Sequence, residues 1–235
     1  DPAFALVLTT PSSYVVELPA AETGLGTAQV QIVHNSPSPA VDIYVDGTLA
    51  VENFTYRSST ALVDLPLSTV VGIAPTGGDV IAEFPFTLEQ SVDYVVVASG
   101  ILNDTSTPFT LLASVIEQDA QDDESFALKV LHGVTDAPAV DIYANGGLLI
   151  ENLAYSEFTE YLQVPAGDYT LDITAHGAGE AVASFSAPLT GLGGGTGVLY
   201  ASGFLAGTDT DPAFALVLTT PSSYVVELPA AETGL

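Results

Sequence analysis

The chain has 235 residues, enough for two domains of about 100 residues each. It carries 29 acidic residues against 2 basic ones, a formal net charge of −27. Such a chain repels phosphate backbones and anionic lipid surfaces, so we expect neither nucleic-acid binding nor membrane insertion. Cysteine is absent, which excludes disulfides, thiolate nucleophiles and cysteine-based metal sites.

The first 25 residues recur without a single change as residues 211–235. Divergence between domains does not leave such a stretch untouched, so it indicates a unit of 210 residues that recurs head to tail; the alternative is a duplication without biological meaning. Within the first copy, Phe4–Leu8 and Tyr14–Leu18 predict a β-hairpin. An isolated hairpin is marginal in water. We therefore expect another chain, a preceding repeat or a sheet edge of the following module to support it.

Residues 26–118 predict a first β-sandwich, module A. Its segments are short, rich in β-branched residues and separated by turn signals, and several alternate apolar with polar residues. Asp46-Gly47 is a hairpin signal because both residues tolerate positive φ. The predicted strands are Gln29–His34, Val41–Val45, Leu49–Val51, Thr60–Leu65, Val70–Pro75, Val80–Phe86, Asp93–Gly100 and Phe109–Ile116.

An acidic linker, residues 119–124, follows module A. Its carboxylates are weak candidates for a Ca²⁺ site, since this hard cation takes six to eight oxygen ligands. The spacing of known calcium loops is absent and runs of charge are usually solvated, so we expect no metal and no other cofactor. The candidate ligands are Asp119, Asp122, Asp123 and Glu124.

Residues 125–235 predict a second β-sandwich, module B. Asn145-Gly146 repeats the hairpin signal, and no segment of the chain keeps a 3.6-residue period. We therefore predict an all-β protein of two tandem antiparallel β-sandwich domains, Ig-like or transthyretin-like, with almost no helix. The predicted strands are Ala127–His132, Val140–Ala144, Leu148–Ile150, Glu160–Val164, Asp168–His176, Val182–Phe185, Gly197–Gly203, Phe214–Thr219 and Tyr224–Leu228.

The two modules are diverged copies of one another. His34–Tyr44 matches His132–Tyr143 with one residue inserted, and Ala-Ser-Gly recurs at Ala98 and Ala201. The run H-x-S-P-x-P-A-V-D-I-Y, followed by E-N, T-x-Y-L-x-V-P-A-G-x-Y-T and Y-x-A-S-G, resembles the domain of unknown function 4397 family. Module A departs from it at Leu67-Ser-Thr-Val70. The resemblance implies β-sandwiches of exported bacterial and archaeal surface proteins, often in tandem, and implies no catalytic residues.

No pattern of catalytic or metal-binding residues stands out, so we expect no enzyme. His34 and His132 lie at equivalent strand ends, as structural histidines do, and His176 stands alone in a turn. Asp42 and Asp141 lie in separate modules and suit hydrogen bonds to the Ser/Thr-rich turns beside them. The remaining candidates lack their partners: Ser99 and Ser202 have no nucleophile elbow, and the glycine-rich loop at 191–197 has no lysine for a phosphate.

The duplicated ends point to a structural role, as the repeat unit of an extracellular filament or surface fibre. Units would be joined covalently, or a terminal strand of one would complete a sheet of the next. The alternative is a surface adhesin whose Tyr44, Tyr143 and Tyr155 stack on glycans. The expected assembly residues are Phe4, Leu6, Leu8, Tyr14, Val16 and Leu18, with their copies Phe214, Leu216, Leu218, Tyr224, Val226 and Leu228.

Overall fold

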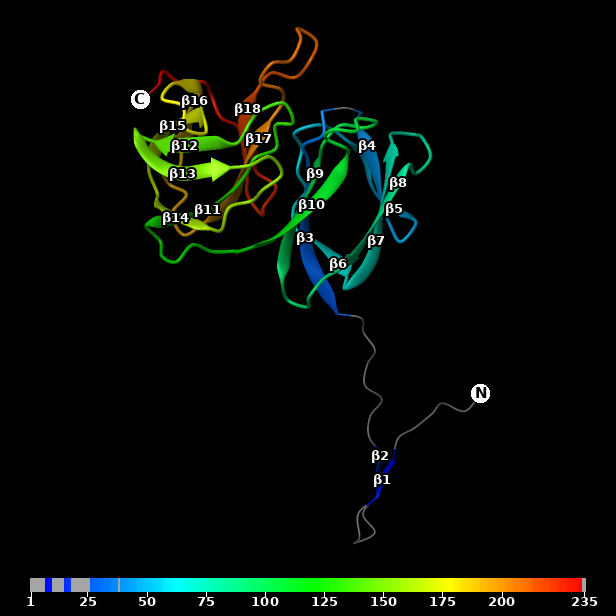
Figure 1. The fold of residues 1–235 in the computed structure, drawn as a ribbon. Helices are drawn as coiled ribbons and strands as arrows, with labels where there is room; N and C mark the ends of the chain where they lie inside the picture. Colours follow the sequence, from blue (N-terminus) through cyan, green and yellow to red (C-terminus); the bar gives the residue numbers. More distant parts are fainter. Residues whose placement is uncertain (1–6, 10–14, 18–25, 38, 234–235) are drawn as a thin grey trace.

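The structure is a computed structural model that describes residues 7–9, 15–17, 26–37 and 39–233 (Figure 1). All of its regular elements in these ranges are strands, as predicted. Two of them, β1 (Val7–Thr9) and β2 (Val15–Glu17), form a separate hairpin. The other 17 build four sheets, two in each of two sandwiches. No described helix is long and apolar enough to cross a membrane.

Module A is a sandwich of two four-stranded sheets. Its strands are β3 (Thr27–His34), β4 (Val41–Val45), β5 (Thr48–Phe54), β6 (Val63–Pro66), β7 (Ser68–Pro75), β8 (Ala82–Thr87), β9 (Asp93–Ser99) and β10 (Thr110–Ile116). One sheet has the order β10-β9-β3-β6 and the other β5-β4-β7-β8. Apolar side chains of both sheets meet in a core that includes Val30, Ile43 and Val71.

Module B repeats this plan with one strand more. Its strands are β11 (Ser125–Leu131), β12 (Val140–Ala144), β13 (Gly147–Leu153), β14 (Leu162–Pro165), β15 (Asp168–Ala175), β16 (Ala181–Pro188), β17 (Thr196–Ser202), β18 (Ala215–Thr219) and β19 (Val225–Glu227). The sheets have the orders β14-β11-β17-β18-β19 and β13-β12-β15-β16. β18 occupies the place of β10, and β19 extends the sheet beyond it.

Each predicted strand of modules A and B has a counterpart, and the differences have local causes. β5 and β13 run past the predicted Leu49–Val51 and Leu148–Ile150 because a bulge interrupts their alternation. One pair in each module, β3 with β9 and β11 with β17, is parallel rather than antiparallel. Both hairpin turns have positive φ at both central residues, as the Asp-Gly and Asn-Gly signals predict.

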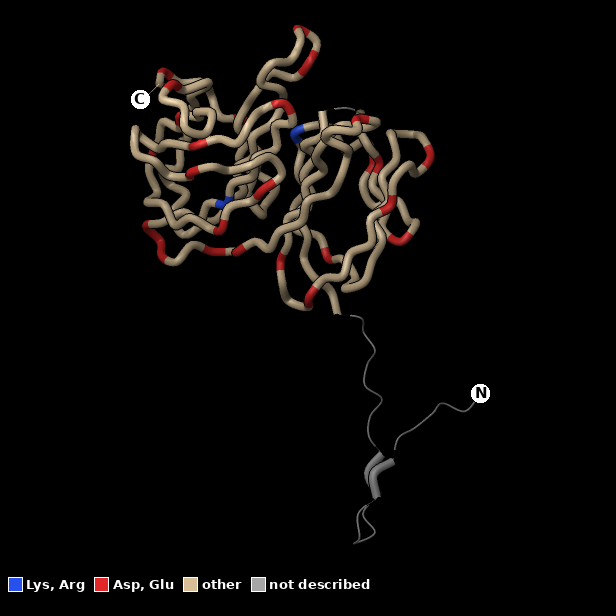
Figure 2. The backbone as a smooth tube through the Cα atoms, in the orientation of Figure 1, with Lys and Arg blue, Asp and Glu red and all other residues tan. Residues whose placement is uncertain are grey.

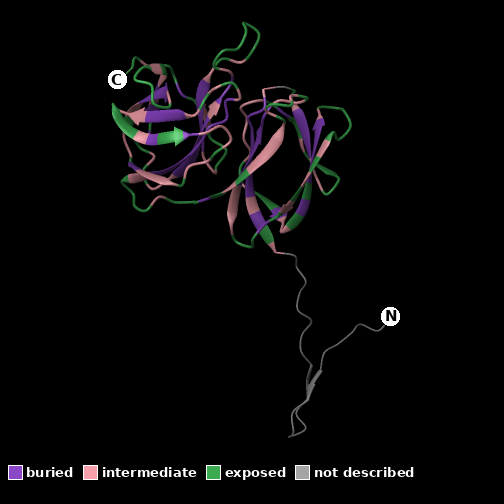
Figure 3. Cartoon of the chain, in the orientation of Figure 1, coloured by how far each residue is buried: buried purple, intermediate pink, exposed green. Residues whose placement is uncertain are grey.

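The two sandwiches pack against one another through one sheet each. A separate apolar cluster lies between β3, β9 and β10 of module A and β11, β17 and β18 of module B. Buried residues follow β9 and β18 on both of their faces (Figure 3). The buried members of this cluster are Val33, Val95, Val97, Ile116, Leu131, Val198, Tyr200 and Val217.

Candidate assembly site

The duplicated segment is seen in place at the C-terminal end of module B. β18 pairs with β17 on one side and with β19 on the other, both antiparallel. The turn between β18 and β19 is closed by the bonds Thr220 N–H to Tyr224 O and Ser223 N–H to Thr220 O, both 3.0 Å long. Ser223 takes a positive φ of 66°, which reverses the chain there.

Side chains of this segment belong to the core of module B. Leu216, Leu218 and Leu228 are 1 %, 2 % and 3 % exposed and lie in its main apolar cluster. Phe214 and Val226 pack against that cluster, and the Phe214 ring meets Phe185 edge to face at 5.5 Å. Val217 lies between Leu216 and Leu218, so its side chain points to the opposite face of the sheet, where it packs in the cluster shared with module A. Module B is therefore incomplete without residues 211–235. Five of the six predicted assembly residues in this copy belong to the core or pack against it, whereas Tyr224 is 55 % exposed.

The N-terminal copy forms the same hairpin. β1 and β2 pair Val7 with Glu17 and Thr9 with Val15, and β18 and β19 use the identical register 210 residues later. The difference lies in the third strand. Among the described strands, β1 pairs only with β2, whereas β18 is also bonded to β17. Leu8 and Val16 lie on β1 and β2. The other predicted residues, Phe4, Leu6, Tyr14 and Leu18, lie outside the described residues.

Arg57 of module A binds the C-terminal copy of the duplicated segment. Its guanidinium donates to the Glu227 carboxylate at 2.7 Å, to the Ala213 carbonyl at 2.6 Å and to the Ser202 hydroxyl at 3.1 Å. The first two acceptors belong to the duplicated segment. The guanidinium also lies 5.0 Å from the Tyr56 ring centroid. Sequence reasoning did not single out Arg57, although its status as one of two cations in the chain was a usable signal (Figure 2).

The contact between the modules has an approximate twofold symmetry. Gln31 on β3 and Lys129 on β11 occupy matching places in the two modules, as do Ser114 on β10 and Thr219 on β18. Gln31 Nε2 donates to Thr219 Oγ1 at 3.3 Å, and Lys129 Nζ donates to Ser114 Oγ at 2.8 Å. Each module therefore presents the same face to the other and makes the same bond in both directions.

Gln31 and Lys129 are both buried at this contact. The Gln31 amide also donates to the Thr220 carbonyl at 2.6 Å and to the Thr60 carbonyl at 3.1 Å. The Lys129 ammonium lies 4.9 Å from the centroid of the Tyr161 ring. Burial lowers the pKa of Lys129 from its ordinary value, against the opposing charges of acidic neighbours. Both cations of the chain thus lie where the modules meet.

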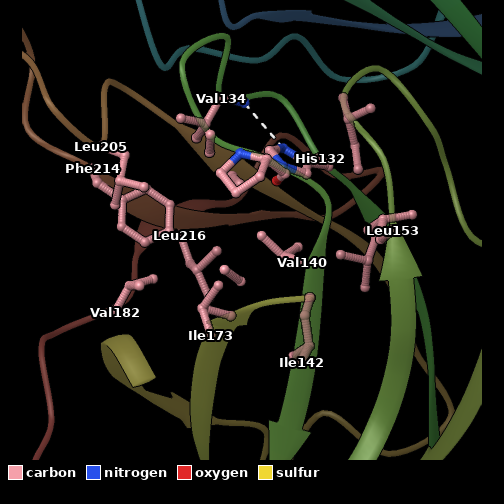
Figure 4. Close-up of a pocket in the computed structure, with 16 residues that line it drawn as sticks. His132, Val134, Val140, Ile142, Leu153, Ile173, Val182, Leu205, Phe214 and Leu216 are labelled. Atoms are coloured by element: carbon pink, nitrogen blue, oxygen red, sulfur yellow. Dashed lines mark hydrogen bonds between the residues drawn. The ribbon is translucent and has the colours of Figure 1, made fainter. Parts of the chain in front are cut away.

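The two histidines at strand ends are structural, and their environments match. His34 Nδ1 accepts from the Ser36 amide and its Nε2 faces the Pro39 carbonyl at 3.0 Å. His132 does the same with the Val134 amide and the Pro138 carbonyl at 2.9 Å. Burial lowers the pKa of both imidazoles. Figure 4 shows His132 beside a cavity of about 30 Å³ that Phe214 and Leu216 help to line.

The buried aspartates of the Val-Asp-Ile-Tyr strands hold backbone loops rather than forming a catalytic pair. Asp42 accepts from the Asn53 and Gly77 amides at 2.7 and 2.9 Å, and these bonds lower its pKa. Asp141 accepts from the Asn152 and Gly177 amides at 2.7 and 3.0 Å. The predicted bond to a Ser/Thr turn is present at Asp42, whose carboxylate also accepts from the Thr76 side chain, but backbone amides are the main donors to both aspartates. Asn53 and Asn152, which supply two of these amides, adopt positive φ.

His176 is not solitary, contrary to the prediction. Its Nδ1 lies 2.8 Å from the Asp141 carboxylate, and the side chain is 43 % exposed. Burial acts to raise the pKa of Asp141, but the two backbone bonds and His176 outweigh it and lower that pKa. The pairing was hidden in the sequence because 35 residues separate the two partners.

The acidic linker does not gather into a metal site in the structure. No group of three His, Asp or Glu side chains in the described ranges could hold a metal ion, and this includes Asp119, Asp122, Asp123 and Glu124. Asp122 instead accepts from the Glu124 amide at 3.0 Å. The glycine-rich loop at 191–197 is bonded to the linker and to β11, because Gly194 O accepts from the Ala120 amide and Gly194 N–H donates to Ser125 O.

The residues considered for catalysis or glycan stacking are dispersed. Ser99 and Ser202 are both buried, and the Ser202 hydroxyl is used by Tyr56 and Arg57 at the module contact. Tyr44 and Tyr143 lie half-buried on β4 and β12, in different sandwiches, and Tyr155 packs edge to face on His132 at 6.2 Å. These three tyrosines form no common exposed face.

Comparison with known families agrees with the duplicated architecture. The family model described as Domain of unknown function (DUF4397) matches twice, over residues 28–125 and 126–222. These ranges correspond to the two sandwiches. No curated protein matches the chain. The chain belongs to the DUF4397 family and contains two tandem copies of its domain.

Proposed function

We propose that this protein is the repeat unit of an extracellular structural fibre, joined head to tail through residues 1–25 and 211–235. The observation that carries the proposal is the double occurrence of one segment whose C-terminal copy completes the module B core. An N-terminal copy with the same hairpin register has the side chains needed to complete another module of type B. The proposed role needs no catalytic group and no cofactor.

Two kinds of junction fit this role. In a covalent array, residues 1–25 are the end of the preceding unit, already seated in that unit's module B. In a non-covalent array, the segment of one subunit enters the module B of the next by strand addition. Burial of Leu and Phe side chains, worth about 1.5–3 kcal/mol each, stabilises either junction without disulfides.

The mass of the intact protein, measured under denaturing conditions, distinguishes the covalent from the non-covalent junction. A mass of many 210-residue units indicates a covalent array, and a mass near one unit indicates strand addition. A chain of one unit that remains monomeric in its native state contradicts the fibre.

A pair of truncated chains tests the junction itself. Residues 1–210 and residues 26–235 have the same length and composition, because the segment is merely moved from one end to the other. We expect the 26–235 chain to be a folded monomer with a complete module B. The 1–210 chain has a donor segment and an open acceptor, so we expect it to form head-to-tail oligomers.

Light scattering after size-exclusion chromatography measures the outcome. Addition of a peptide of residues 211–235 to the 1–210 chain serves as a control, since it fills the acceptor and should cap the oligomers. Two monomers of equal size would contradict strand addition between chains.

A further inference from the structure

The duplication allows the two cores to be compared position by position, and they differ at one end. In module A, Phe86 on β8 pairs with Thr69 on β7, and in module B, Ala187 on β16 pairs with Tyr169 on β15. Ala187 therefore takes the place of Phe86.

A second large side chain is missing from module B at the same end. The Leu88 amide donates to the Leu67 carbonyl, and the matching Leu189 amide donates to the Gly167 carbonyl. Gly167 therefore takes the place of Leu67, which packs against the module A core. A Cβ added at Gly167 would meet no described atom within 4 Å. Two partly buried apolar side chains that pack against the core of module A are thus absent from module B.

The space they leave remains open between the sheets. Module B has a cavity of about 220 Å³ whose walls include Ala187, Leu171, Leu199, Leu218 and Leu228. The void beside Phe86 in module A measures about 20 Å³. The two linings share matched positions such as Phe86 and Ala187, and Leu228, which follows the additional strand β19, lines the module B cavity alone. The difference in volume therefore follows from the exchanged side chains and from the added strand.

Several side chains that line the cavity in module B are larger than the residues at the matching positions of module A. Tyr169 stands where module A has Thr69, and the bulged Leu149 stands where it has Ala50. Leu218 replaces Ala113, which is exposed in module A. Module B thus lacks the apolar side chains of Phe86 and Leu67 and has larger side chains at three other positions of the cavity lining.

The chemistry of the lining defines the occupant. Among the described residues, Gln163 and Tyr169 are the only polar side chains in the lining, and the Tyr169 hydroxyl already donates to the Pro165 carbonyl at 2.8 Å. None of these lining side chains is charged, and a buried charge without a partner is costly. An apolar cavity of about 150 Å³ in another protein stays dry and binds benzene. We propose that module B binds a small, uncharged apolar molecule of the size of one hydrocarbon ring in this cavity.

Access lies at the turn between β14 and β15. Pro165 is exposed, and Gln163 and Tyr169 are partly exposed while also lining the cavity. Leu218 and Leu228 come from the duplicated segment, so the occupant contacts it directly. The binding site itself belongs to module B and does not require that units assemble into a fibre.

Benzene titrated into the full chain tests the proposal, with the leucine methyl groups observed by NMR. We expect saturable shifts at Leu199, Leu218 and Leu228 and a thermal unfolding midpoint that rises with benzene concentration. Absence of saturable shifts in the folded protein overturns the proposal. Benzoate, the same ring with a carboxylate, should bind at least tenfold more weakly, and equal binding overturns the uncharged occupant.

Filling the cavity provides the matched variants. Ala187→Phe restores the side chain that module A has, and should weaken benzene binding at least tenfold. Ala113→Phe makes the same change at an exposed position and should leave the Kd unchanged. Gly167→Leu restores the other side chain that module A has and serves if Ala187→Phe does not fold. An unchanged Kd in a folded cavity-filling variant contradicts the assignment.

Discussion

Hydrogen bonds of His34 and His132 require a neutral imidazole. Nδ1 accepts a backbone N–H in each case, which leaves Nε2–H to donate to a proline carbonyl. Burial favours the same form and lowers the pKa of each ring below the ordinary 6.5. The ring thereby fastens the loop that follows its own strand, which explains why both modules keep a histidine at this place.

This arrangement predicts that stability decreases as the solution becomes mildly acidic. Below pH 6.5 the unfolded chain binds protons that the folded chain does not, so the free energy of unfolding decreases as the pH decreases. Urea unfolding between about pH 7 and about pH 5 measures this slope. Replacing both rings, His34→Gln with His132→Gln, should flatten it. A slope that persists in this double variant would assign the effect to other groups.

The duplicated segment permits one substitution to be made in two places. Leu216 is 1 % exposed in the module B core, so Leu216→Ala should cost about 2–5 kcal/mol of unfolding free energy. Leu6 occupies the same position in the first copy. On the proposed role as a donor, Leu6→Ala should change the stability of the full chain by less than about 0.5 kcal/mol, and in the 1–210 chain, whose acceptor is open, it should weaken association instead.

Urea unfolding and analytical ultracentrifugation of the two variants make the comparison. Equal losses of unfolding free energy would mean that the first copy is already seated within its own chain, which contradicts a donor role.

Arg57, where β19 meets module A, should contribute more to the free energy of unfolding than its ion pair with Glu227 alone. Glu227 is 57 % exposed, so the pair alone is worth about 0.2–1 kcal/mol. Loss of the bonds to Ala213 and Ser202 as well makes Arg57→Gln cost about 1–3 kcal/mol. A double-mutant cycle with Glu227→Gln, measured by urea unfolding, separates the two contributions. A coupling energy equal to the whole effect of Arg57→Gln would contradict this division.

The strands could be predicted from sequence because most of them alternate or lie between turn residues. Val41–Val45 is an example in which the predicted and observed bounds coincide. The contact between the modules could not be predicted in this way. β9 and β18 are apolar on both faces, and such a run does not say which face meets the strand's own core and which meets another module.

Side-chain partners distant in sequence were also beyond prediction. His176 meets Asp141, and Arg57 meets Glu227 across 170 residues. Only the fold brings such groups together. The duplicated segment is the exception, because its identity in two places is visible in the amino-acid sequence itself.

At the scale of the whole molecule, the twofold relation between modules limits how units can join. An isologous contact uses the same face of both partners, and here both copies of that face are occupied within one unit. A neighbouring unit must therefore be contacted through other surfaces. In a fibre, each unit would act as one closed pair of sandwiches, with the duplicated segment as the connection to the next pair.

This view predicts that the two sandwiches stay together when the chain between them is cut. A protease site inserted after Ala120 would open the linker without touching the apolar cluster at the contact. We expect the cleaved protein to elute as one species in size-exclusion chromatography, at the volume of the intact chain. Separation of the two halves would show that the linker, rather than the contact, holds the pair.

Tyr200→Glu supplies the matched control for this experiment. Tyr200 is 0 % exposed between the modules, and a buried carboxylate there would carry a desolvation cost and compete with Glu227 for the charge of Arg57. After cleavage this variant should release its halves, while the uncut variant remains one chain. Because the substitution lies on the face that meets module A, each released half should keep its own β-sheet circular dichroism. Loss of that signal in the module B half would instead assign Tyr200 to the internal stability of module B.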